Sequence, residues 1–196
     1  RVETVGQAFE RERLLLSPLP AEAFDPATVL SVKVDSKSRV CVRQCHYSVP
    51  AGIRRSSVNV KLFASEVHII VDGTVVGVHQ RCLHKGEQSL LLDHYLEVIA
   101  RKPGALASSV TLAQARRDGT FTTSHEDWWH RCRLTVGDRA STVGLCQVLL
   151  LGRRYPTAAI IGGLDIANRL GSTEPNLVEI ETRRIVDNQR PTITAI

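Results

Sequence analysis

The spacing of the apolar residues changes once along the chain, near residue 90. Between Val29 and Leu83 apolar and polar residues alternate, and Gly or Pro separates the runs, which is typical of short antiparallel strands. From Leu91 onward the apolar residues recur at helical intervals. The change predicts an α+β chain: a small antiparallel barrel or sandwich over residues 28–90, followed by a small all-α domain over residues 91–186. Of the two sheet architectures we expect the barrel, of SH3-like form.

Both ends of the chain have a different character. Residues 1–27 predict the last part of a helix followed by a linker, because the helical spacing stops at Ser17-Pro18-Leu19-Pro20, which cannot continue a helix. Residues 187–196 predict a flexible tail. The chain begins at Arg1 and contains no methionine, so we expect it to be an internal piece of a longer protein.

Two hairpins are predicted within the sheet module. Asp72-Gly73 lies between two alternating runs and fits a two-residue turn, whose central positions both need positive φ. The expected pairs are Val71 with Thr74, Ile69 with Val76 and Val67 with Val78. A second hairpin is expected between Ser31–Val34 and Arg39–Cys45, with Val34 facing Val40 and Val32 facing Val42. That register places Lys33, Arg39, Cys41 and Arg43 on the face opposite the core.

Capping residues and Pro divide the second half into separate helices. Ser124 and Asp138 each precede an apolar run and predict two helix starts, and Pro156 predicts a third. Trp128 and Trp129 are adjacent in the first of these helices. Neighbours in a helix do not face the same core, so we expect one of them to anchor an interface.

Composition excludes several classes of protein. The 196 residues are 43% apolar and 23% charged, which suits one or two globular domains. No apolar run approaches the ~18 residues that a membrane span needs. Five scattered cysteines in a chain without a secretory signal favour reduced thiols and a cytoplasmic location.

The sequence contains no clear motif of a catalytic or metal-binding site. Cys41, Cys45, His46, Cys82 and His84 are possible metal ligands, but regular strand geometry would separate the first two by over ~13 Å and turn His46 to the opposite face. No Gly-x-Ser-x-Gly, Walker or Gly-x-Gly-x-x-Gly pattern is present. We therefore predict no catalytic residue and no metal site in this chain.

Basic residues concentrate in the sheet module. Residues 36–93 carry eight Lys or Arg against four Asp or Glu, within a chain of net charge +5. Cations on a rigid sheet neutralise phosphates and hold a nucleic acid without reading its sequence. The predicted DNA-binding residues are Arg39, Arg43, Tyr47, Arg54, Arg55, Lys61, Arg81 and Lys85.

Four stretches carry a resemblance to a known family. They are Cys45-His46-Tyr47-Ser48-Val49-Pro50, Val58-Asn59-Val60-Lys61, Val75-Val76-Gly77-Val78-His79 and the most specific one, His94 to Leu106 (HYLEVIARKPGAL). Together they resemble the C-terminal region of an IstA-type insertion-sequence transposase, from about Val5 to Ile185.

This resemblance implies a parent protein of the DDE, retroviral-integrase-like class. In that class three carboxylates hold two Mg²⁺ ions for phosphodiester attack, and a β-barrel similar to that of phage Mu transposase follows the catalytic core. The implied partners are transposon-end DNA, an IstB-type AAA+ ATPase and further copies of the chain, with no membrane. The carboxylates would lie upstream, so Asp25, Asp35, Asp72 and Asp93 inherit no catalytic role, and the fragment itself is expected to need no cofactor.

Two other hypotheses stay open at this point. The helical domain would serve only protein–protein interaction, for multimerisation or recruitment of the helper ATPase, and the chain would bind no DNA by itself. Alternatively, the cysteines and histidines would form a metal centre of an enzyme, which elemental analysis would detect.

Overall fold

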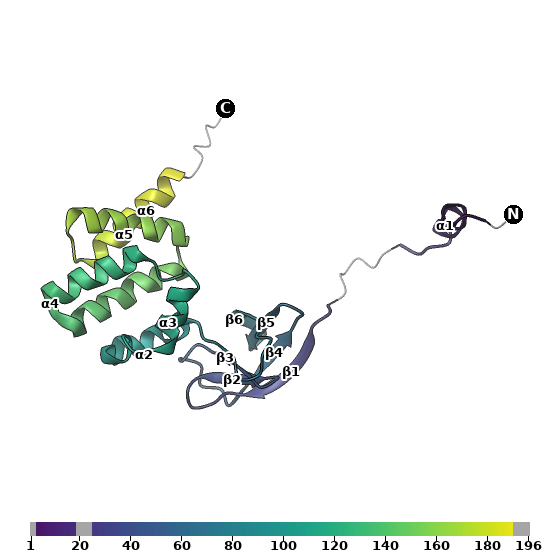
Figure 1. The fold of residues 1–196 in the computed structure, drawn as a ribbon, viewed down its shortest axis with the longest axis horizontal. Helices are drawn as coiled ribbons and strands as arrows, with labels where there is room; N and C mark the ends of the chain where they lie inside the picture. Colours follow the sequence, from purple (N-terminus) through teal and green to yellow (C-terminus); the bar gives the residue numbers. More distant parts are fainter. Residues whose placement is uncertain (1–2, 19–24, 190–196) are drawn as a thin grey trace.

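Seven short strands lie between an N-terminal helix and a group of helices (Figure 1). The protein's structure is a computed structural model that describes residues 3–18 and 25–189. The predicted linker and flexible tail fall largely on residues 19–24 and 190–196, which lie outside the described residues. The strands are β1 (Thr28–Lys33), β2 (Arg39–Val42), β3 (Cys45–Ser48), β4 (Ser57–Leu62), β5 (Glu66–Val71), β6 (Thr74–Gln80) and β7 (Gln88–Ser89).

The strands form two sheets. One has the order β1-β4-β5-β6, and the other has the order β2-β3-β7. An isolated antiparallel bridge between Val34 and Val40 connects them. The α+β class and the antiparallel sheet are therefore confirmed, whereas no single sheet closes into the expected SH3-like barrel within the described residues. Both sheets share one apolar core, to which Val40, Tyr47, Val60 and Ile69 contribute.

The Asp72-Gly73 hairpin has the predicted turn but a different register. Val71 faces Thr74 as expected, and a bulge between Ile69 and Ile70 then shifts the pairing by one residue. Val67 consequently faces His79 rather than Val78. Because a shift of one residue reverses the faces of a strand, His79 is buried and Val78 is 45% exposed.

The second predicted hairpin is largely wrong. Only the Val34–Val40 pair forms, because β1 pairs with β4 and β2 pairs with β3. The cause is a two-residue turn at Arg43-Gln44, which sets Val42 opposite Cys45 and divides the expected strand in two. Arg43 and Gln44 both have positive φ, 50° and 65°.

The helical part confirms helix starts near Asp138 and after Pro156, whereas the first of the three predicted helices is capped by Thr122 rather than by Ser124. Its elements are η1 (Leu92–Tyr95), α2 (Leu96–Arg101), η2 (Pro103–Ala105), α3 (Val110–Arg117), α4 (Thr123–Leu150), η3 (Leu151–Arg153), α5 (Thr157–Leu170) and α6 (Pro175–Gln189). Gly137, with φ 80° and ψ 169°, breaks α4 into the two helices that Ser124 and Asp138 predicted. Among the described residues no helix is both long and apolar enough to cross a bilayer.

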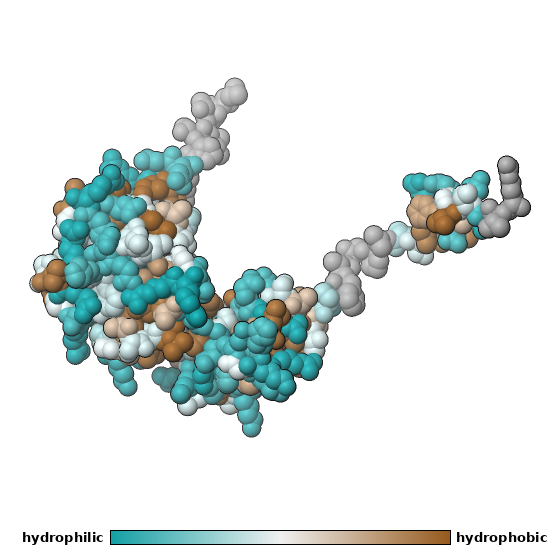
Figure 2. Space-filling model, viewed as in Figure 1, coloured by the Kyte–Doolittle hydropathy of each residue, from teal (hydrophilic) through white to brown (hydrophobic). Residues whose placement is uncertain are grey.

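A helix precedes the linker, but it has its own start within residues 1–27, which corrects the expectation that these residues hold only the last part of a helix. It is α1 (Val5–Arg13), and Thr4 and Gln7 form a capping box at its start. None of its residues is buried. In Figure 1 it lies apart from the sheets and the other helices, and Figure 2 shows hydrophobic residues on its surface.

Buried polar groups connect the sheets to the helices. The Oγ of Ser48 accepts from the N–H of Leu91 (2.9 Å) and lies 2.8 Å from Nδ1 of His94. Nε2 of His79 donates to the carbonyl oxygen of the same serine over 2.8 Å. Because each of these groups is desolvated, its partner is required, and the two parts of the chain are held in one arrangement.

Candidate nucleic-acid interface

Four of the predicted DNA-binding cations already have acceptors. Nε and Nη2 of Arg39 contact Oδ2 of Asp35, each at 2.9 Å, and its Nη1 donates to Gln88. The other three pairs are Arg55 with Asp72 (2.8 Å), Lys61 with Asp25 (2.7 Å) and Arg81 with the carbonyl oxygen of Phe63 (2.9 Å).

These contacts differ in how easily they open. The Arg55–Asp72 and Lys61–Asp25 pairs are solvent-exposed, and exposed ion pairs contribute little to stability. A phosphate therefore competes for these two cations. Arg39, by contrast, is half-buried and braces the turn before β2, where Asp35 also accepts from the backbone N–H groups of Lys37 and Arg39.

The remaining three predicted cations are unpaired and exposed. Arg43, Arg54 and Lys85 have no carboxylate within ion-pair distance among the described residues. Lys33 and Lys37 share these properties, and our sequence prediction omitted both from the DNA-binding set. Figure 2 shows a largely hydrophilic surface over the sheets on the face in view.

Backbone contacts bring Arg43 and Lys85 to the same end of the smaller sheet. The N–H of Gly86 donates to the carbonyl oxygen of Gln44 over 2.9 Å, so the β2–β3 turn lies against the loop before β7. The sequence showed no such proximity, because the two segments are about forty residues apart.

Tyr47 does not belong to this surface. It is 1% exposed, and its hydroxyl accepts from the N–H of Cys82 over 2.9 Å. Burial raises the pKa of this phenol to about 12. The pairing of β2 with β3 turns its ring into the shared core, so it cannot stack on a base or reach a phosphate.

Trp128 and Trp129 are also buried, at 0% and 5% exposure, which corrects the expected interface anchor. The first packs near Gly144 and the second lies edge-on to Phe121. Two adjacent positions are buried because this helix has neighbours on more than one side.

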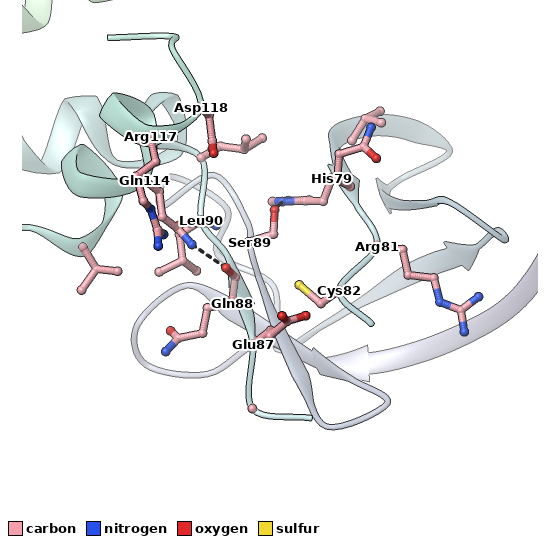
Figure 3. A pocket seen from close by; sticks show the side chains of 15 residues that line it. His79, Arg81, Cys82, Glu87, Gln88, Ser89, Leu90, Gln114, Arg117 and Asp118 are labelled. Carbon is pink, nitrogen blue, oxygen red and sulfur yellow. Dashed lines mark hydrogen bonds between the residues drawn. The ribbon is translucent and has the colours of Figure 1, made fainter. Parts of the chain in front are cut away.

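A hollow of about 680 Å³ separates β6 and the following loop from α3 (Figure 3). His79, Arg81 and Cys82 lie on one side, and Gln114 and Arg117 lie on the other. The amide of Gln114 donates to the carbonyl oxygen of Gln88 and accepts from the N–H of Leu90. This glutamine fixes α3 against the connecting segment.

Comparison with known proteins adds to this geometry. Residues 19–91 match the family model described as Mu transposase, C-terminal domain. A transposase of Aminobacter aminovorans is 25% identical over 200 residues, which cover 98% of this chain and 37% of that protein. The chain resembles the C-terminal region of an insertion-sequence transposase. This resemblance, predicted from the four stretches above, is confirmed.

Other transposase relatives match a shorter part of the chain. The transposase for insertion sequences IS1326/IS1353 of Pseudomonas aeruginosa is 29% identical over 117 residues, which are 57% of this chain and 23% of that protein. The protein of the same description from Shigella flexneri matches equally well. The chain thus spans well under half the length of these transposases. No solved structure matches it.

The described residues do not offer the cluster of carboxylates that would bind the two magnesium ions of a DDE transposase. Among the described residues no three His, Cys, Asp or Glu side chains gather where they would hold a metal ion. Cys45 instead donates through its Sγ to the carbonyl oxygen of His84 (3.1 Å). We derive no metal-dependent step for this chain.

Proposed function

We propose that the chain is the DNA-binding and assembly portion of a DDE transposase that inserts a mobile element, and that it carries no catalytic residue itself. The sheet module holds the phosphate backbone of the transposon ends. The helical part serves self-association and contact with an IstB-type AAA+ ATPase. The magnesium-binding carboxylates belong to another part of the parent protein, which acts in the bacterial cytoplasm at the nucleoid.

The observation that carries the proposal is the set of exposed cations without partners on the sheet module. Arg43, Arg54 and Lys85 come from three separate segments and have no neutralising carboxylate among the described residues. Their charges are therefore available to phosphates, and the release of counterions from DNA favours the contact. The exposed pairs of Arg55 and Lys61 add two cations that can exchange their partners.

A second candidate function is protein interaction without DNA binding. The turn that divides α4 exposes Leu134 (77%) and Val136 (51%), which are apolar side chains suited to a protein partner. The ion pair between Arg133 and Asp138 braces this turn. The second candidate therefore places the function in the helical part alone.

DNA affinity of two charge-matched variants separates the candidates. We compare Arg43→Ala/Arg54→Ala/Lys85→Ala with Lys102→Ala/Arg169→Ala/Arg183→Ala, which removes three exposed cations from the helical part. The full chain binds a fluorescent 30-base-pair duplex at 100 mM salt, and anisotropy gives its Kd. We expect the first variant to bind at least about tenfold more weakly and the second to bind like wild type.

Two other results would contradict DNA binding by the sheet module. Equal weakening by both variants would place the effect in net charge rather than in the sheet module. Absence of binding by the wild-type chain, together with loss of self-association in Leu134→Ser/Val136→Ser, would favour the protein-interaction function.

A further inference from the structure

The β2–β3 turn has the wrong residue types for its conformation. A two-residue hairpin turn with positive φ at both positions strongly prefers Asn-Gly, Asp-Gly or Gly-Gly. Asp72-Gly73 follows this preference in the other sheet, with φ of 48° and 81°. Arg43 and Gln44 adopt the same region with φ of 50° and 65° although both carry long side chains. Left-handed backbone at such residues is strained.

Packing does not explain these two residues. Both side chains are exposed, and neither has a hydrogen-bond or ion-pair partner in the part of the chain that the structure describes. Among the described residues, the hydrogen bond that joins the turn to a neighbouring segment is made by backbone, from the N–H of Gly86 to the carbonyl oxygen of Gln44. Any pair of residues that tolerates positive φ would make this contact equally well.

The neighbouring loop is held by internal hydrogen bonds and carries one more cation. Oε2 of Glu87 accepts from the N–H groups of Leu83 and His84, each at 3.0 Å, and these contacts hold the pKa of the Glu87 carboxyl below its usual value. The carbonyl oxygen of His84 accepts from Sγ of Cys45 at the base of β3. Lys85 is thereby fixed beside the turn, and the carboxylate of Glu87 is occupied by its own loop.

We propose that this tip, formed by the Arg43-Gln44 turn and the loop 83–87, enters a groove of the DNA and reads base edges. The inference rests on the proposed function and adds sequence recognition to it. The major groove admits a two-stranded β-ribbon. Arg43 presents its guanidinium to guanine, Gln44 presents its amide to adenine, and Lys85 contacts the adjacent phosphate. Side-chain length and donor pattern at the tip are then the reason for the unfavourable turn residues.

The test replaces the turn by the residues that its backbone prefers. In Arg43→Asn/Gln44→Gly the backbone keeps its positive φ but with less strain, which should raise Tm by roughly 2–6 °C. The full-length variant and the wild type each select binders from a pool of 30-base-pair duplexes with ten random central positions. We expect the wild type to enrich a sequence with guanine and adenine at fixed places. For the stabilised variant, the ratio of its affinity for that sequence to its affinity for a random duplex should fall at least about tenfold.

Two single variants separate base reading from charge. Arg43→Lys keeps the positive charge but lacks the bidentate fork, so affinity for random duplex should stay within about twofold while the guanine preference falls. Arg54→Ala, away from the turn, should weaken binding to all sequences alike and leave the enriched sequence unchanged.

The alternative outcomes separate base reading by the tip from DNA binding itself. An enriched sequence that is the same for wild type and Arg43→Asn/Gln44→Gly would overturn base reading by the tip. Wild-type binding to duplexes without any enriched sequence would also overturn it, while DNA binding itself would stand. Failure of the wild type to bind any duplex would instead reject the proposed function.

Discussion

Strand β6 passes His94 at Gly77, where a side chain has no room. A Cβ placed on this glycine would lie 2.9 Å from Cε1 and 3.1 Å from Nε2 of His94. The imidazole cannot retreat easily, because Ser48 holds its Nδ1. The close approach of the sheet to the connecting segment therefore depends on the absence of one methyl group.

Gly77→Ala should lower the free energy of unfolding by about 1–3 kcal/mol, because the new methyl group overpacks this contact. Urea denaturation followed by circular dichroism measures the change. Gly52→Ala is the matched control, since a Cβ there meets nothing within 4 Å. Equal stabilities of the two variants would show that β6 does not approach His94 in this way.

Three buried histidines make the stability depend on pH. Burial lowers the pKa of His79 to about 4 and that of His125 to about 4, and it also lowers the pKa of His94. As the pH falls, these imidazole rings therefore stay neutral in the folded chain, whereas in the unfolded chain they take up protons near pH 6.5. Because the unfolded state binds more protons between pH 6.5 and 4, stability falls as the pH drops through that window.

Lowering the pH from 7 to 5 should reduce the free energy of unfolding by up to about 2 kcal/mol for each of His79 and His125. Urea midpoints at half-unit pH intervals measure this loss above the range in which most carboxyl groups titrate. His125→Gln should show a shallower pH dependence than wild type. A midpoint that is constant from pH 7 to 5 would contradict the burial of these neutral rings.

At the scale of single elements, turns and caps were more predictable than registers. The helix start near Asp138 and the Asp72-Gly73 turn follow from local residue preferences, and the structure confirms both. The bulge between Ile69 and Ile70 does not follow from local preferences. It accompanies a contact between residues distant in the sequence, the hydrogen bond from His79 to Ser48. The Arg43-Gln44 turn could not be predicted from the sequence, because its residue types do not match its conformation.

Helices α5 and α6 pack closely through Gly162 and Gly163. A Cβ on Gly163 would lie 2.5 Å from Oγ1 of Thr182 and 2.8 Å from the carbonyl oxygen of Val178. The second contact is with backbone, so a rotamer change cannot relieve it. The sequence does not reveal this contact, because the partner helix begins twelve residues later.

Gly163→Ala should therefore destabilise the chain by roughly 1–3 kcal/mol and shift its thermal midpoint downward. Gly152→Ala serves as the control, because a Cβ at that position meets no atom within 4 Å. Differential scanning calorimetry compares the two. If Gly163→Ala melts like the control, the two helices are not as close as described.

At the scale of the whole molecule, the sequence located the basic module but not the state of its charges. The concentration of Lys and Arg in residues 36–93 is visible in the sequence. Their partners are not, since Lys61 pairs with Asp25 and Arg55 with Asp72 across the fold. The structure thereby separates occupied cations from available ones, and this separation defines the proposed DNA surface.

The salt dependence of DNA affinity tests this surface most directly. Each phosphate contact contributes about 0.9 to the slope of log K against log salt concentration for duplex DNA. For the full chain on a 30-base-pair duplex, Arg43→Ala/Arg54→Ala/Lys85→Ala should reduce the magnitude of the slope by about 1.8, because Arg54 and Lys85 each give up a phosphate contact. The charge-matched variant Lys102→Ala/Arg169→Ala/Arg183→Ala should keep the wild-type slope. Identical slopes for all three proteins would contradict the account that the sheet module grips the DNA backbone.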